Sequence, residues 1–220
     1  MIHFDFLTFN AFQERCAIVW DKDKFCAIID PGNSSDGEFD ELVAKIGQYD
    51  LKPVCIMLTH GHFDHVLGVA KVARHYGNLP IYMHPQDRFT LENNTYFCKA
   101  FNAPLPEAFE TTDVTEGDMI HVGSLDFEVI ETPGHTVGGI CYLERTEKVL
   151  FSGDTLFAGA IGRTDHPGGD YDKIMESIFT KLLHLDGDTK VIPGHGPATD
   201  IATERMTNPF LMPFNEPYEE

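Results

Sequence analysis

Residues 57–68 read MLTHGHFDHVLG and place four residues that commonly bind metals within six positions: His60, His62, Asp64 and His65. The apolar run 54–58 that leads into them is typical of a buried strand. Side chains on an extended backbone face the same side at every second residue, so His60 and His62 project together. His65 breaks this alternation, and we expect the chain to turn there into a helix. The spacing therefore predicts two pairs that face two neighbouring ions.

Three later segments place a metal-ligand residue type beside glycine at the expected end of a strand. TPGHT, FSGDT and IPGHGP contribute His135, Asp154 and His195. Glycine lets the backbone approach an ion closely. With the opening motif they make seven candidates, more than the four ligands of a tetrahedral zinc. We therefore expect two ions, each with an open position for water: the first held by His60, His62 and His135, the second by Asp64, His65 and His195, with Asp154 shared.

Other histidines lack such neighbours. We expect them at the surface or in the core: His3, His75, His84, His121, His166 and His184. A single histidine at a strand end is more often a hydrogen-bonded structural residue than a ligand. A purely structural zinc site is not indicated either, because such sites are usually rich in cysteine and these motifs contain none.

The order of the expected elements indicates an α/β protein. Residues 16–30 read as a hairpin, and apolar residues recur at helical spacing in 37–47, 66–77 and 171–185. Residues 86–112 contain two prolines and are expected to form a helix fragment and a loop. A second hairpin, 140–154, resembles the first and hints at two similar halves. Because the elements follow one another without linkers, residues 1–220 are predicted to form one domain.

The composition restricts the partners. Sixteen Lys and Arg against 35 Asp and Glu give a net charge of −19, which repels phosphate backbones and anionic lipids. No segment approaches the ~20 apolar residues of a membrane span, and the N-terminus lacks the features of a signal peptide. Five widely spaced cysteines fit reduced thiols. We expect a cytoplasmic protein that acts on a small molecule, not on nucleic acid or a membrane, and the oligomeric state stays open.

The motif THGHFDH (59–65), with IIDPG before it and PGHT, SGDT and PGHGP after it, closely resembles the metallo-β-lactamase superfamily. The resemblance covers nearly the whole chain. It implies a four-layer αββα sandwich of two similar halves, with the metals at one edge and the same seven ligands. β-Lactamases with the H-x-H-x-D motif commonly lack a histidine at the position equivalent to His65. They have Cys or Ser at the position equivalent to Asp154. Antibiotic hydrolysis is therefore not expected as the main task.

The segment FSGDTLFAGAIGRTD (151–165) is most similar to glyoxalase II, hydroxyacylglutathione hydrolase, and its short relatives. Glyoxalase II continues into a helical C-terminal domain that grips glutathione. Only 25 residues follow His195 here, so no such domain is expected. The resemblance implies a binuclear hydrolase that cleaves S-lactoylglutathione or a related acyl thioester with a metal-bound hydroxide. Zinc is the expected metal, with Fe or Mn as alternatives, and Asp64 and Asp154 would also orient the hydroxide.

Substrate contacts are expected in two segments. Arg163 would meet a substrate carboxylate or support the metal site, although an exposed structural role is equally compatible with its position. Tyr96, Phe97 and Phe101 would line the substrate pocket or lie in the core.

Other activities remain open at this point. GRTD and TPGHT also resemble persulfide dioxygenases, which use a single iron held by two histidines and a carboxylate. Here that set would come from His60 and His135, or from His62 with Asp154, and the sequence does not choose. A lactonase or another ester hydrolase would use the same ligands. A non-catalytic module is disfavoured, because a degenerate site would have lost some of its ligands.

Overall fold

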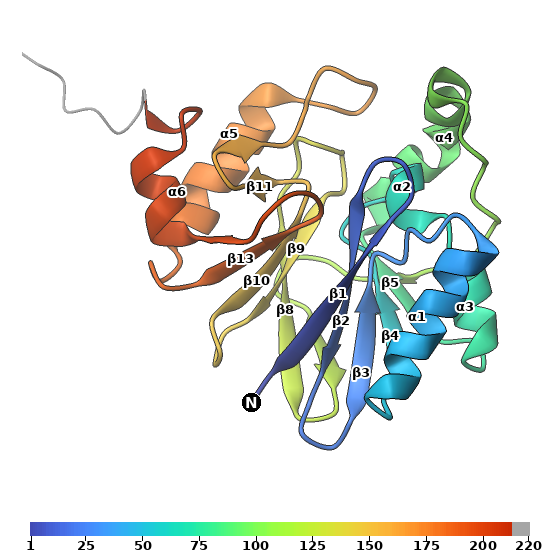
Figure 1. Ribbon diagram of the computed structural model, residues 1–220. Helices are drawn as coiled ribbons and strands as arrows, with labels where there is room; N and C mark the ends of the chain where they lie inside the picture. The colour runs from blue at the N-terminus through green and yellow to red at the C-terminus, as the bar shows by residue number, and fades with distance from the viewer. Residues whose placement is uncertain (213–220) are drawn as a thin grey trace, which may run out of the picture.

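Two six-stranded β-sheets pack face to face, with helices on the outer face of each (Figure 1). The computed structural model describes residues 1–212. The strand order is β1-β2-β3-β4-β5-β6 in the first sheet and β14-β13-β10-β9-β8-β7 in the second. The four-layer αββα architecture expected from the sequence is thereby confirmed.

The first sheet joins an antiparallel N-terminal part to a parallel part. β1 pairs with β2 and β2 with β3 in antiparallel fashion, whereas β3, β4, β5 and β6 run parallel. The parallel strands are connected through helices, as parallel pairs require. The strands are β1 (His3–Phe9), β2 (Glu14–Trp20), β3 (Phe25–Ile29), β4 (Lys52–Met57), β5 (Ile81–Met83) and β6 (Thr112–Asp113).

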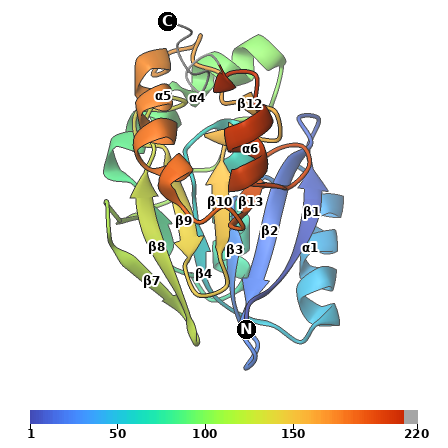
Figure 2. The same ribbon diagram turned by 90° about the vertical axis from the view of Figure 1, so that its left-hand side faces the viewer.

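The second sheet is mainly antiparallel. Its exception is β10, which pairs in parallel with β13 across the connection that contains α5 (Tyr171–Thr180). Figure 2 shows this sheet in front of β2, β3 and β4. The strands are β7 (Met119–Val122), β8 (Leu125–Glu131), β9 (Ile140–Glu144), β10 (Val149–Gly153), β13 (Lys190–Pro193) and β14 (Thr199–Asp200), and β11 (Leu156–Phe157) and β12 (Ala160–Ile161) form a separate hairpin.

Apolar side chains fill the three spaces between the four layers. One cluster, which includes Val19, Tyr142 and Phe151, lies between the two sheets. A second cluster joins the first sheet to α1 (Asp36–Gln48) and α3 (Val69–His75), and a third joins the second sheet to α5 and α6 (Ile201–Thr207). Because both faces of each sheet are covered, central strands such as β2 and β10 are buried at almost every position.

The prediction of one helix over 66–77 is wrong in its bounds. Two helices, α2 (Phe63–Val66) and α3, occupy this region and are separated at Gly68. A Cβ at Gly68 would lie 1.8 Å from Asn33 Oδ1, so the chain can pass the neighbouring loop only with glycine. The helix expected over 37–47 is confirmed as α1, where Ser35 accepts a hydrogen bond from the Glu38 amide.

Two further elements differ from expectation. The helix in 86–112 is no fragment: α4 runs over fourteen residues, Arg88–Phe101. The helix expected over 171–185 ends at Thr180, and a short 3₁₀ turn, Leu182–His184, completes it. Within residues 1–212, no helix has both the length and the apolarity needed to cross a membrane. Residues 213–220 of the expected domain lie outside the described part of the chain.

Candidate metal centre

The opening motif lies where β4 leaves the first sheet. His60 and His62 follow the strand in extended backbone, and His62 is the N-cap residue of α2. The chain turns into the helix at Phe63, earlier than the expected turn at His65. Asp64 therefore projects from a helix and not from the extended segment. The early turn gives the two pairs different neighbours, although the rings of His60 and His65 stay close, with centroids 4.2 Å apart.

A cluster of three histidines, the histidine cluster, consists of His60, His62 and His135. One nitrogen from each ring lies within 4.8 Å of the other two. His62 Nδ1 is 2.9 Å from His135 Nε2, and His60 Nε2 is buried without a hydrogen-bond partner. Ring nitrogens that converge in this way, away from water, fit a bound cation.

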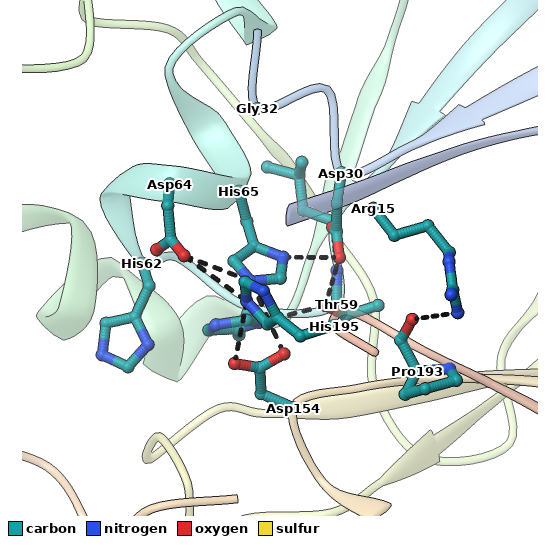
Figure 3. Close-up of polar contacts among 12 residues, drawn as sticks. Arg15, Asp30, Gly32, Thr59, His62, Asp64, His65, Asp154, Pro193 and His195 are labelled. Carbon is teal, nitrogen blue, oxygen red and sulfur yellow. Dashed lines mark hydrogen bonds and ion pairs between the residues drawn. The ribbon is translucent and has the colours of Figure 1, made fainter. Parts of the chain in front are cut away.

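A second cluster, the mixed cluster, consists of Asp64, His65 and His195. The Nε2 atoms of His65 and His195 are 3.1 Å apart. Asp64 Oδ2 is 3.5 Å from His195 Nε2 and 3.8 Å from His65 Nε2. Figure 3 shows these side chains facing one another at the end of α2 and beside the loop after β13.

Asp154 lies between the two clusters. It follows β10, and its carboxylate reaches His65 Nε2 and His195 Nε2, each at 3.5 Å (Figure 3). It also lies 3.6 Å from His135 Nε2. Its Oδ1 atom is buried and makes no hydrogen bond among the described residues. The structure therefore brings together all seven residues that the sequence analysis selected, with Asp154 in contact with members of both clusters.

The two clusters differ in their electrostatics. Burial lowers the pKa of His60 and of His62 well below the ordinary value, and neighbouring histidines lower it further. Burial alone would also lower the pKa of His65, but the carboxylates of Asp154 and Asp64 outweigh it and raise the pKa well above the ordinary value. The pKa of His195 is raised for a similar reason, by Asp64 and Asp154 against its burial.

The far nitrogens of four of these rings have partners in the protein. His65 Nδ1 lies 3.1 Å from Asp30 Oδ2, and His60 Nδ1 lies 3.0 Å from Thr59 Oγ1. His135 Nδ1 and His195 Nδ1 lie 2.8 Å and 3.1 Å from the carbonyl oxygens of residues 163 and 12. Such contacts orient the rings and leave Nε2 free for a metal.

Asp30 links this outer layer to the fold. It follows β3, and its carboxylate accepts hydrogen bonds from the Thr59 amide at 2.8 Å and from the Thr59 hydroxyl at 2.6 Å. Asp30 lies in the IIDPG segment, but no role was predicted for it from the sequence. Like Asp154, it directly follows a strand, although it is not itself beside glycine.

A cavity of about 370 Å³ opens above the clusters. Phe97, Phe101 and Arg163 line it, as do members of both clusters. Tyr96 does not: its side chain is 60% exposed and lies outside the lining, so its expected place in the pocket is wrong. Arg163 Nε donates a hydrogen bond to Asp165 Oδ1 at 2.9 Å.

His166 is a residue that the sequence analysis missed. It lines the cavity, and its ring centroid lies 4.9 Å from that of His62 and 5.0 Å from that of His135. The loop 162–170 folds back over the histidine cluster to place it there, which no local pattern indicates. His84, in contrast, pairs with Glu131 at 3.0 Å and is not part of either cluster.

Comparison with known proteins gives a family match for this chain. Residues 10–195 match the sequence profile of the Metallo-beta-lactamase superfamily. A relative from Haemophilus influenzae, described as hydroxyacylglutathione hydrolase GloC, is 39% identical over 212 residues, which cover 96% of this chain and 98% of that protein.

Two solved structures share the fold closely. The BLEG-1 B3 metallo-beta-lactamase superposes with a TM-score of 0.87 at 35% identity and covers 95% of this chain and 99% of its own. TTHA1623, solved in a di-iron-bound form, gives a TM-score of 0.83 at 36% identity, with 94% and 100% covered.

Proposed function

Since the chain belongs to the metallo-beta-lactamase superfamily, we propose that it is a glyoxalase II-like binuclear metallohydrolase that cleaves S-lactoylglutathione or a related acyl thioester. The observation that carries the proposal is the pair of clusters that share Asp154 at the base of a cavity. The description of the Haemophilus relative supports the thioester as the substrate class.

The residues of the two clusters fit a pair of divalent ions. His60, His62 and His135 would hold one ion, Asp64, His65 and His195 the other, and Asp154 would be shared. Zinc suits imidazole and carboxylate ligands, with iron or manganese as alternatives. When bound, the ions would supply Lewis acidity and a water molecule of lowered pKa.

The protein's own groups have defined tasks in the reaction. The carboxylates of Asp64 and Asp154 accept hydrogen bonds and thereby orient the attacking water toward the acyl carbon. A carbon–oxygen bond forms, the carbon–sulfur bond breaks, and the thiolate that leaves takes up a proton, so no oxidant is consumed. Because a thiolate is a good leaving group, the reaction does not depend on a strong general acid.

One sample can separate this proposal from its rivals. The protein is purified without chelator, its metal content is measured, and it is assayed with S-lactoylglutathione, other acyl thioesters, lactones and a cephalosporin. We expect about two ions per chain and thioesters as the best substrates. One iron per chain with oxygen uptake on glutathione persulfide would instead support the mononuclear dioxygenase. Preference for lactones would assign the same ligands to a lactonase.

A further inference from the structure

The cavity above the clusters has largely aromatic walls. Phe12, from the loop between β1 and β2, packs edge to face against Phe63 and Phe101, with ring centroids 5.0 and 5.2 Å apart. Phe63 begins α2 and Phe101 ends α4, so three separate segments build one wall. Phe101 remains 51% exposed although its ring packs against Phe12 and Phe63, and the rest of the side chain lines the cavity.

The opposite wall is apolar as well and is held in place by the C-terminal part of the chain. Phe157 and Ile161, from the β11–β12 hairpin, line the cavity. Glu204, on α6, accepts a hydrogen bond from the Gly159 amide at 2.9 Å, and Asn208 donates to the Ala160 carbonyl at 3.1 Å. Both side chains are buried. The hairpin is therefore fixed, and the cavity is formed before a substrate binds.

Positive charge is scarce in this cavity. Among the described residues that line it, Arg163 is the one lysine or arginine. Its guanidinium makes two hydrogen bonds to Asp165, at 2.9 and 3.2 Å, and both side chains are 71% exposed. Glutathione carries two carboxylates and one ammonium group, a net charge of −1. The protein's net charge of −19 opposes its approach, and the one guanidinium of the lining is already paired with Asp165.

We therefore propose that the preferred substrate is a thioester whose thiol carrier bears no carboxylate and whose acyl group carries an aromatic or similarly bulky apolar side chain. This inference rests on the proposed thioester hydrolysis and narrows its substrate class. The cavity of about 370 Å³ falls within the usual range for small-molecule pockets, about 300–1,000 Å³, and accommodates a phenyl ring beside the reacting carbonyl group.

Four thioesters test the two parts of the inference separately. Lactoyl and mandeloyl groups share a 2-hydroxyl and differ by methyl against phenyl, and each is joined to glutathione or to N-acetylcysteamine, which is uncharged. With the metal-loaded protein, we expect kcat/KM to rise about tenfold for the phenyl group and about tenfold for the uncharged carrier. A highest kcat/KM for S-lactoylglutathione would overturn the inference and leave the proposed function intact. Hydrolysis of none of the four would refute the proposed function itself.

A binding measurement is independent of turnover and of metal. Calorimetry compares the thioethers S-benzyl-N-acetylcysteamine and S-benzylglutathione on the metal-free protein. We expect the neutral compound to bind about tenfold more tightly. Equal or reversed affinity would contradict the inference.

Two variants on α4 form a matched pair. Phe101→Ala removes a ring from the wall and is expected to lower kcat/KM for the mandeloyl ester of N-acetylcysteamine about tenfold, while the lactoyl ester changes less than about twofold. The control is Phe89, on the same helix, whose side chain is 43% exposed and lies outside the cavity. In Phe89→Ala, kcat/KM for both esters should be unchanged. An equal loss for both esters in Phe101→Ala would contradict the assignment of Phe101 to the acyl side chain.

Discussion

The histidine cluster and the mixed cluster lie side by side, yet they are prepared for a cation in different ways. His60, His62 and His135 have lowered pKa values because they are buried together, so they are neutral and have free lone pairs at physiological pH. His65 and His195 lie against carboxylates that raise their pKa values, so they bind protons more readily than the other three rings. An ion would meet unprotonated ligands at the first cluster and would compete with protons at the second.

The largest effect is expected where the clusters meet. Asp154→Asn removes the charge that both clusters share and should lower kcat/KM about a thousandfold, equivalent to ~4 kcal/mol. Steady-state assays and metal analysis of the same sample test this expectation. Asp126→Asn, on an exposed aspartate paired with His121, is the control and should change neither quantity. Normal activity in Asp154→Asn would show that the clusters do not depend on a shared carboxylate.

A smaller and selective loss is expected at Asp30. The carboxylate contacts His65 Nδ1, in the mixed cluster, and reaches His60 only through the Thr59 hydroxyl, so Asp30→Asn should weaken the second ion about 10–100-fold and the first ion less. Asparagine also tolerates the positive φ of 49° at this position, which limits damage to the backbone. Titration with a competing chelator measures the two affinities. Equal weakening of both ions would mean that the clusters are not independent.

The pH dependence should follow the same division. Protonated His65 and His195 compete with the metal, so the affinity for the second ion should fall as the pH is lowered, about tenfold per pH unit for each proton displaced. His60 and His62 stay neutral at a pH above the ordinary value near 6.5, since burial holds their pKa values well below it. Calorimetry in buffers of different ionisation enthalpy counts the released protons. Equal proton release at the two binding steps would contradict the expected difference in protonation between the two clusters.

The sequence predicted the seven candidate ligands because each follows a strand or starts a helix beside a recognisable motif. It also predicted the αββα architecture, through the family resemblance and the order of the elements. Tyr96 was misplaced because the length of α4 was not foreseen. On a continuous helix Phe97 and Phe101, four residues apart, share one face, and Tyr96 points elsewhere.

Other parts of the site carried no local signal. The carbonyl groups of residues 12 and 163 orient His195 and His135, and any residue type could supply a carbonyl there. His166 reaches the histidine cluster only because its loop folds back, which depends on tertiary packing. The need for glycine at position 68, between α2 and α3, likewise depends on Asn33, a residue distant in sequence.

Metal content of the Asp64→Ala protein tests the two-cluster account most directly. Asp64 belongs to the mixed cluster alone, so its loss should leave the histidine cluster able to bind. We predict about two ions per chain in the unaltered protein and about one in Asp64→Ala, measured by elemental analysis after equal metal loading and desalting. Two ions in Asp64→Ala would contradict the account, and one ion in both proteins would indicate a mononuclear site.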